Sequence, residues 1–464
     1  MLKKTFFRSF AALLALCLLF ALPAQAEDFD DFYDDGYVEE EWHPDPLKAS
    51  ISASATSVLV GQAVKFPVKA SGGIPPYTVK LTVTSGGAVV ASQFIGAKNR
   101  RGSERSSGQL ILIAAISGIA VSAAVLLLRR PLLRLLFRSV EDEVMASALT
   151  YFTVTALSFP FISVYNAAAA LFRSMGNSRI SMISSLVINI INIIGNSIFI
   201  FGFGMGVAGA ALSTLLSRFC AMAFLLVRLS VKDSELRLRL RNMIPDLSVI
   251  RKILYIGLPS CFENSLFQLG RILVVIIITG FGTAQIAANA IANNLDSFGC
   301  IPGKGLQLAV ITVVGQCVGA QMKDEAYFYA RKLMKIAYAL TAVANILVMA
   351  TLPLTVPIYN VSEEAQHLAI ILVLIHTAFA IILWPSAFVM PNVLRAGGDV
   401  KYTLAVSVFS MGMFRIVFSY IFALGFSLGA IGVWCAMVMD WVFRASMFVG
   451  RFRSGKWIGE SLAK

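Results

Sequence analysis

Charged and amide side chains interrupt a long apolar segment near the middle of the chain. The run Ile253–Ile278 has the length and apolar character of a membrane-spanning helix. It nevertheless contains Glu263, Asn264, Gln268 and Arg271. Asn264, Gln268 and Arg271 share one helical face, and Glu263 lies about 100° to the side of that face. Ionisable groups are costly in hydrocarbon, so those that occur there commonly belong to a binding or ion-coupling site.

The acidic member of this set, Glu263, could carry an exchange reaction. We interpret it as a carboxyl group that loses its proton when a substrate or Na⁺ binds and regains the proton afterwards. Burial makes such an exchange possible near neutral pH. The alternative is a static carboxyl group that stays neutral or pairs with Arg271.

A second polar stripe follows in the next apolar run, Ala284–Val318. Gln285, Asn289, Asn293 and Asp296 lie on one helical face of this run. Four polar side chains on one face favour the wall of a cavity, in which Asp296 would be a second candidate for ion coupling. The alternative is hydrogen bonding between neighbouring helices.

Two further groups of polar residues lie in other apolar runs. Asp440 precedes Arg444 by four residues, a spacing that favours an ion pair within one helix, with a coupling role for Asp440 as the alternative. In the first half of the chain, Asn189, Asn192 and Asn196 share one face and are expected to line a cavity.

The sequence contains no recognisable catalytic or metal-binding motif. His376 stands alone within an apolar run, so we interpret it as a packed hydrogen-bonding group and not as a ligand. The six cysteines lack the spacing of zinc ligands and are expected to be free thiols. Nucleotide-binding loops, nucleophile elbows and metal-hydrolase motifs are absent from the sequence. The sequence therefore predicts no enzyme, no metal site and no bound cofactor.

The composition is typical of a polytopic membrane protein. Of the 464 residues, 57% are hydrophobic and only 14% are charged, whereas a soluble domain has about 25% charged residues. The net charge of +13 could indicate a nucleic-acid partner, but the basic residues lie in short loops between apolar runs. We therefore expect the lipid bilayer, and no nucleic acid, as the partner. Ten apolar runs are long enough to span the bilayer: Leu110–Leu128, Met145–Phe172, Ile180–Phe201, Val207–Val227, Ile253–Ile278, Ala284–Val318, Leu333–Leu352, Leu368–Met390, Tyr402–Phe422 and Gly429–Val449.

The charges of the loops predict the orientation in the membrane. Basic residues gather in the alternate loops that follow residues 172, 227, 318, 390 and 449. The opposite loops, at 202–206, 279–283, 353–365 and 423–428, contain no Lys or Arg. The C-terminus is therefore predicted to be cytoplasmic. The segment Arg129–Arg138 is an exception, and its apolar-basic pattern predicts a helix that lies in the membrane interface.

The start of the chain differs in character from the rest. Residues 1–26 have the basic start, apolar core and Ala-x-Ala end of a bacterial secretory signal peptide. Residues 27–47 are acidic and aromatic, which predicts a disordered linker. Residues 48–85 alternate between apolar and polar types around a Gly-Gly-Ile-Pro-Pro turn, which predicts a small β-rich fragment. Its phrase GGIPPYTVKLTV resembles bacterial immunoglobulin-like and PKD-type surface modules, at about half the length of such a sandwich.

An internal repeat divides the remaining chain into two copies. Ser92–Ala97 matches Gly315–Ala320, and Phe203–Gly209 matches Phe426–Gly432, both at an offset of 223 residues. Two copies with the same orientation predict an all-α bundle of two lobes. We place the N-terminal lobe at 86–229, a basic cytoplasmic linker at 230–252 and the C-terminal lobe at 253–464. Apart from residues 86–97, the first copy has no counterpart for the first two apolar runs of the second, so the first lobe is expected to lack two helices.

From Gly86 onward, about four-fifths of the chain resembles bacterial transporters of the MATE (multidrug and toxic compound extrusion) family. Eight phrases in order carry this resemblance: VASQFIGAKNR, LFRSMGNSRISM, INIIGNSIFIFGFGMGVAGAALST, IGLPSCFENSLFQLGRILV, AANAIANN, ITVVGQCVGA, LWPSAFVMPNVLRAGGDV and GVWCAMVMDWVFR. The resemblance implies twelve helices in two lobes and proton- or sodium-driven export of mostly cationic organic compounds. Glu263 matches the acidic residue that several MATE proteins use in a second-lobe cation site. The family's first helix, which often supplies an acidic coupling residue, has no recognisable counterpart.

Two functions are compatible with the sequence. The first is a bacterial inner-membrane antiporter in which entry of H⁺ or Na⁺ drives the export of small organic cations, while the two lobes rock about a central cavity. The second is a non-transporting hybrid of a secreted surface module and a truncated permease. Only Leu81–Ala97, seventeen uncharged residues, would connect an external module to the predicted inner loop at Lys98–Arg105, and this length is marginal for a span.

Overall fold

The computed structural model describes residues 78–136, 142–231, 238 and 240–459. These segments consist of helices and their connections, without a strand, and one isolated antiparallel bridge joins Gly398 to Ile458. The prediction of an all-helical bundle is thus confirmed for the described part of the chain. The predicted signal peptide at 1–26, the acidic linker at 27–47 and residues 48–77 of the predicted β-rich fragment lie outside it.

The first lobe is built from helices that follow one another along the chain. Its elements are α5 (Thr78–Gly96), α6 (Arg100–Leu136), α7 (Asp142–Leu157), α8 (Phe159–Ser174), α9 (Ser178–Asn196) with its π-helical end η4 (Ser197–Gly202), and α10 (Gly206–Ser230).

The second lobe follows a linker that contains one short 3-10 turn, η5 (Leu240–Met243). It begins with three long helices, α11 (Leu247–Thr279), α12 (Thr283–Gly319) and α13 (Lys323–Thr355), the last followed by η6 (Val356–Tyr359). Two helices that contain π-helical turns come next, and they consist of α14 (Glu363–Trp384), η7 (Pro385–Val389) and α15 (Met390–Ala396), then α16 (Val400–Ser410), η8 (Met411–Val417), α17 (Phe418–Tyr420) and η9 (Ile421–Gly425). The last helix is α18 (Gly429–Arg453).

The membrane-spanning helices agree with the predicted apolar runs. Nine described helices are long and apolar enough to cross a membrane, and the pair α7 and α8, bent by 41°, makes a tenth candidate. Each predicted run falls on one of these ten candidates. The bend lies next to Pro160, which has no N–H group for the helix ladder. Residues Arg129–Leu136 are helical, as we predicted, and continue α6.

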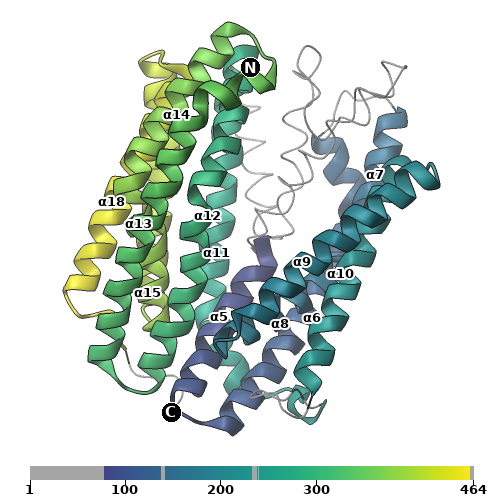
Figure 1. Cartoon of the computed structure of the whole chain (residues 1–464), viewed down its shortest axis with the longest axis vertical. Helices are drawn as coiled ribbons and strands as arrows, with labels where there is room; N and C mark the ends of the chain where they lie inside the picture. The colour runs from purple at the N-terminus through teal and green to yellow at the C-terminus, as the bar shows by residue number, and fades with distance from the viewer. Residues whose placement is uncertain (1–77, 137–141, 232–237, 239, 460–464) are drawn as a thin grey trace.

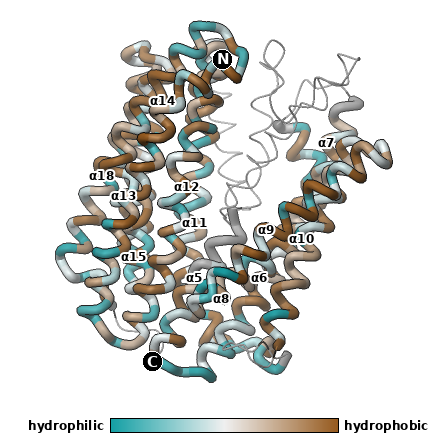
Figure 2. The backbone as a smooth tube through the Cα atoms, in the orientation of Figure 1, coloured by the Kyte–Doolittle hydropathy of each residue, from teal (hydrophilic) through white to brown (hydrophobic). Residues whose placement is uncertain are grey.

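The two lobes meet at one end of the molecule and splay apart at the other (Figure 1). Hydrophilic residues gather at the end where the lobes meet, while long stretches of both lobes are hydrophobic (Figure 2). The ends of α5 and α12 and the starts of α6 and α13 lie at this closed end. The basic segments that follow α5 and α12 in sequence therefore lie there too.

Helix α5 corrects the interpretation of the N-terminal segment. Thr78–Ser85, which we predicted as strand, form the beginning of α5. This helix packs against α6, α8, α11 and α12, and Val89, Val90 and Ala91 on it are buried. The alternation in TVKLTV reflects local β propensity, which depends strongly on context. Within a bundle of membrane helices a helical conformation is favoured instead, because a helix satisfies its own backbone hydrogen bonds. The first lobe therefore has a helical counterpart of α12, and within the described residues only α11 lacks one.

Helices α5 and α12 cross so closely that only glycine fits. A Cβ atom at Gly96 would lie 2.0 Å from the carbonyl oxygen of Gln316, and one at Gly319 would lie 2.0 Å from the carbonyl oxygen of Gln93. Gly96 and Gly319 are the equivalent glycines of the two repeats, as are Gln93 and Gln316. The repeat found in the sequence thus forms the contact between the lobes.

Helix α11 packs into the cores of both lobes. Val249, Ile253 and Ile256 belong to the apolar cluster of the first lobe, whereas Val274 and Ile277 belong to that of the second. The boundary between the two apolar clusters therefore falls within α11.

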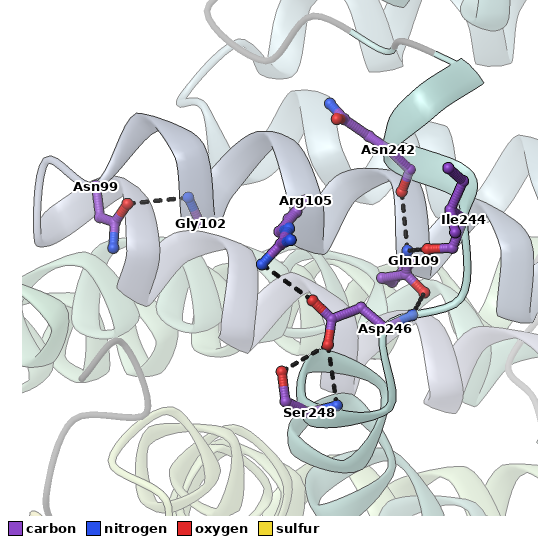
Figure 3. Close-up of polar contacts among 8 residues, drawn as sticks. All are labelled: Asn99, Gly102, Arg105, Gln109, Asn242, Ile244, Asp246 and Ser248. Atoms are coloured by element: carbon purple, nitrogen blue, oxygen red, sulfur yellow. Dashed lines mark hydrogen bonds and ion pairs between the residues drawn. The ribbon is translucent and has the colours of Figure 1, made fainter.

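The linker between the lobes is anchored to α6 (Figure 3). Gln109 donates hydrogen bonds from Nε2 to the carbonyl oxygens of Asn242 at 2.8 Å and Ile244 at 2.7 Å, and its Oε1 accepts one from the Asp246 N–H at 3.0 Å. Arg105 forms an ion pair with Asp246 at 3.2 Å. The chain therefore enters α11 from a fixed point on the first lobe.

Asp246 also caps the N-terminus of α11. Its Oδ1 accepts hydrogen bonds from the backbone N–H of Ser248 at 3.1 Å and from the Ser248 hydroxyl at 2.6 Å (Figure 3). The hydroxyl of Ser248, together with the backbone N–H and the Arg105 guanidinium, holds the pKa of Asp246 below its usual range.

Candidate functional site

Glu263 lies buried on α11, and both of its carboxylate oxygens have donors. Oε2 accepts a hydrogen bond from Arg395 Nη2 at 2.6 Å, and Oε1 accepts one from the Ser407 hydroxyl at 2.6 Å. Arg395 lies near the end of α15 and Ser407 lies on α16. The carboxylate therefore joins three segments of the second lobe. The ion pair that we considered for Glu263 exists, but its cation is Arg395 and not Arg271.

Arg395 is itself held by a second contact. Its Nη1 donates a hydrogen bond to Asn392 Oδ1 at 3.0 Å. Leu171–Gly176 matches Val393–Gly398 at an offset of 222 residues, so Arg173 is the repeat equivalent of Arg395. Arg173 instead donates to the Ser181 hydroxyl at 2.9 Å. The two lobes therefore use the same arginine position differently.

The remaining members of the predicted stripe on α11 are half-buried. These are Asn264, Gln268 and Arg271. Gln268 Oε1 is buried and makes no hydrogen bond within the described part of the chain. Such an acceptor is costly to leave without a donor, so it can accept a hydrogen bond from a bound polar group. Arg271 interacts electrostatically with Arg415 of η8.

Asp440 forms the ion pair that its spacing predicts. It is fully buried, and its Oδ1 lies 3.3 Å from Arg444 Nε. The hydroxyl of Ser410 also donates a hydrogen bond to Asp440 Oδ1. The guanidinium groups of Arg444 and Arg415 lie over the ring of Phe267, at 5.7 Å and 5.9 Å from its centre. Phe267 on α11 thus contacts both cations.

Asp296 contacts residues that the sequence did not connect with it. His376 Nε2 on α14 contacts Asp296 Oδ1, and Cys300 Sγ donates to the same oxygen at 3.3 Å. This contact agrees with our interpretation of His376 as a packed hydrogen-bonding group, and it identifies the partner as a carboxylate.

The other polar residues of α12 mainly join helices. Gln285 Oε1 accepts a hydrogen bond from the Ala430 N–H at 2.7 Å, and Asn289 Oδ1 accepts one from Trp434 Nε1 at 3.0 Å. Both partners lie on α18. Asn293, which is half-buried, donates to the carbonyl oxygen of Asn289 at 2.7 Å. For Gln285 and Asn289 the structure therefore supports interhelical hydrogen bonding, the alternative to a cavity wall.

The asparagines of α9 also contact a neighbouring helix. Asn192 is buried and donates to the hydroxyls of Thr214 at 3.2 Å and Ser217 at 3.3 Å, both on α10. Asn196 donates to Asn192 Oδ1 at 2.9 Å, and Asn189 is half-buried. Asn192 and Asn196 thus form one network, but that network joins α9 to α10.

The sequence analysis did not identify several of these polar partners. Arg395 was counted as a loop charge, although the MATE-like phrase around it gave a signal. Ser407 and Ser410 gave no signal, because serines in helices usually bond to their own backbone. Arg218 of α10 was also missed; it is buried and donates to the Ser158 hydroxyl at 2.9 Å.

Basic side chains outnumber acidic ones inside the second lobe. Among its described residues, the half-buried acid Asp399 pairs with Arg451 near the helix ends, and three further acids lie inside the lobe: Glu263, Asp296 and Asp440. Each of them interacts with at least one basic residue or histidine. Five basic residues pair with these acids or interact electrostatically within the same group: Arg271, Lys304, Arg395, Arg415 and Arg444. The five basic residues exceed the three acids, which gives the group a net positive charge even when His376 is not counted.

A bundle of membrane-spanning helices in two repeated lobes, with ionisable groups buried among the helices, has the architecture of a secondary transporter. The profile of the MatE family matches residues 75–198 and 259–421, more than half of the chain. The chain therefore belongs to the MatE family of multidrug efflux transporters.

Curated relatives agree with this assignment. The chain is 27% identical over 383 residues to a "Probable multidrug resistance protein NorM" of Thermotoga maritima, with 82% of each chain covered. It is 26% identical over 390 residues to the "Uncharacterized transporter YisQ" of Bacillus subtilis, with 82% of this chain and 84% of the relative covered. Both alignments extend over most of the relatives' length.

Solved structures share the fold. A multidrug resistance MATE family transporter of the MOP superfamily, in an outward-facing conformation, superimposes with a TM-score of 0.76 at 22% identity, covering 92% of each chain. A MOP superfamily transporter from Pyrococcus furiosus gives a TM-score of 0.76 at 23% identity, covering 92% of this chain and 91% of that one. The two-lobe expectation for the described helices is therefore confirmed.

Proposed function

We propose that this protein is a cation-coupled antiporter that exports organic, mostly cationic compounds across the bacterial inner membrane. In this proposal H⁺ or Na⁺ is the coupling ion, and Glu263 is the group that binds it. The single observation that carries the proposal is the buried contact of Glu263 with Arg395 and Ser407.

The contact offers a way to couple ion binding to helix movement. When a proton neutralises Glu263, or Na⁺ displaces the guanidinium, Arg395 loses its charged partner and keeps the hydrogen bond to Asn392. A buried charge without a partner is strongly unfavourable, so α15 must then reposition Arg395 or expose it to water. Because Ser407 holds α16 to the same carboxylate, binding of one ion at Glu263 would act on both segments. Substrate that favours the ionised form of Glu263 would reverse the change.

The orientation follows from the basic loops. The ends of α5 and α12 are followed by basic residues at the closed end of the molecule. The positive-inside rule assigns this end to the cytoplasm. In this orientation the C-terminus is cytoplasmic and the lobes splay apart toward the outside. An exporter that is open toward the outside is in the state that releases substrate.

The alternative of a non-transporting hybrid is not favoured. It depended on a strand-rich external module that ends next to Leu81–Ala97. Residues Thr78–Gly96 form a helix that packs on both lobes, and the family match begins at residue 75. The continuity of this helix with the bundle supports a transporter.

A drug-efflux assay tests the proposal. Cells that express Glu263→Gln should retain a cationic dye such as ethidium, whereas cells with the wild-type chain should extrude it when energised. Glu364→Gln is the matched control, because Glu364 is an exposed acid at the start of α14. Equal efflux by Glu263→Gln and the control, at equal membrane levels, would remove Glu263 from the mechanism.

The net positive interior of the second lobe favours a second candidate function, the export of organic anions. Buried basic groups attract anions and oppose cation binding. Proteoliposomes that contain the purified protein can compare transport of ethidium with transport of carboxyfluorescein. Faster transport of the anion would favour the second candidate over the first.

A further inference from the structure

We propose that Asp296, Cys300 and His376 form a binding site for a divalent cation of the zinc class inside the second lobe. One oxygen, one sulfur and one nitrogen atom from these residues lie within 4.8 Å of one another. Asp296 and Cys300 are one turn apart on α12, and His376 faces them from α14. This site goes beyond the proposed antiport, because binding at it requires no export.

The positions of the three ligand atoms suit one small ion. Cys300 Sγ lies 3.3 Å from Asp296 Oδ1, and His376 Nε2 contacts the same oxygen. Adjacent ligand atoms around a tetrahedral zinc ion, at bond lengths of about 2.0–2.3 Å, have similar separations. Small side-chain rotations would therefore bring all three atoms onto one ion.

His376 supplies an independent reason to expect a ligand. It is fully buried; its Nε2 contacts Asp296 Oδ1, and its Nδ1 makes no hydrogen bond with another described residue. Trp434 and Trp441 pack edge-on against its ring, with centres 5.8 Å and 5.0 Å away. The Trp434 N–H donates to Asn289 and so does not serve the imidazole. A buried imidazole with a carboxylate as its polar contact is costly to leave otherwise unpaired, and coordination of a metal ion through Nε2 would give that nitrogen a further partner.

The donor set selects the class of ion. Na⁺, Mg²⁺ and Ca²⁺ prefer oxygen ligands, whereas a set of carboxylate, imidazole and thiolate suits Zn²⁺. The Asp296 side chain is 22% exposed, which leaves access for the ion and a fourth position for water. Lys304 and Arg415 interact electrostatically with Asp296 and oppose a cation there. We therefore expect an ion that exchanges, and not a permanently held structural ion.

Metal binding by the full-length purified chain tests the site. The protein should be prepared in detergent with an affinity tag that contains no histidine, and titrated with Zn²⁺ against a chromophoric chelator. We expect one Zn²⁺ per chain, which an excess of Na⁺ or Mg²⁺ does not displace. Co²⁺ in place of Zn²⁺ should give the charge-transfer absorption of a thiolate ligand. This spectrum tests sulfur coordination in the wild-type protein without any substitution.

Variants then identify the ligands. Cys300→Ser should abolish the thiolate absorption with Co²⁺. Changing a residue that only supports a metal ligand lowers metal affinity by up to about 100-fold. Asp296→Asn and His376→Ala remove ligands themselves, so each should weaken Zn²⁺ binding by more than about 100-fold. The matched controls are His367→Ala, an exposed histidine on the same helix, and Cys317→Ser, a half-buried cysteine of α12. Both controls should bind as the wild type does.

Two results would overturn the site. One is a wild-type Co²⁺ spectrum without thiolate absorption. The other is Zn²⁺ affinity in Cys300→Ser and His376→Ala equal to that of the two controls, which would assign the binding to surface groups. Because the titration needs no transport, neither result bears on the antiport proposal.

Discussion

Gln93 and Gln316 occupy equivalent positions in the two repeats, and each donates a hydrogen bond across the boundary between the lobes. Gln93 Nε2 donates to the carbonyl oxygen of Ala396 at 3.0 Å, and Gln316 Nε2 donates to that of Ser174 at 2.7 Å. The two acceptors are also equivalent in the repeat and lie at the ends of α15 and α8. The crossing at the closed end is therefore pseudo-two-fold symmetric.

Replacing Gly96 or Gly319 by alanine should destabilise this crossing. Each added Cβ atom would lie 2.0 Å from a carbonyl oxygen of the opposite helix, and over-packing of this kind typically costs about 1–3 kcal/mol. We expect a lower midpoint of thermal unfolding in detergent for both variants. Gly450→Ala is the control, because this helical glycine faces open space and alanine should be neutral or stabilising there. Identical midpoints for all three variants would contradict the close crossing.

Removing Arg395 alone should be more damaging than removing it together with the charge of Glu263. Arg395→Met leaves a buried carboxylate without its cation, which typically costs about 3–5 kcal/mol. The double variant Glu263→Gln/Arg395→Met has no uncompensated charge and should recover part of this loss. Thermal unfolding of both single variants and the double variant gives the coupling energy. Arg179→Met, at an exposed arginine, serves as the control. If Arg395→Met unfolds at the same temperature as this control, the ion pair does not stabilise the protein.

The anchored linker should be sensitive to acid. The hydroxyl of Ser248 and the charge of Arg105 hold the pKa of Asp246 below its usual range. A lowered folded-state pKa means that the stabilisation is complete above the ordinary carboxyl pKa of about 4 and is lost as pH falls through the lowered value. The difference in unfolding midpoint between the wild type and Asp246→Ala should therefore be constant from neutral pH to about pH 4 and shrink below it. A difference that persists undiminished in stronger acid would contradict this assignment.

Hydropathy and local spacing predicted the features that depend on one helix at a time. Ten apolar runs were found because each must be long and apolar enough to cross the bilayer by itself. The Asp440–Arg444 pair followed from helical geometry, which brings residues four positions apart onto one face. The repeat motif around Gln93 and Gln316 also indicated two equivalent segments. These predictions hold whatever the packing of the neighbouring helices.

Features that depend on packing between helices could not be read from the sequence. Thr78–Ser85 has the local composition of a strand, and only its place between four helices explains why it is helical. The partners of Glu263 and Asp296, which are Arg395 and His376, lie far along the chain on other helices. Many polar residues could have faced these acids, and the tertiary fold selects among them.

The central claim is that Glu263 exchanges its bound cation for substrate. It is tested most directly by adding an organic cation to purified protein in weakly buffered detergent solution, with an indicator dye for released protons and radioactive Na⁺ for displaced sodium. Wild-type protein and Glu364→Gln should release H⁺ or Na⁺ in proportion to the substrate bound, and Glu263→Gln should release neither. If Glu263→Gln binds substrate and releases as many cations as the wild type, Glu263 is not the coupling group.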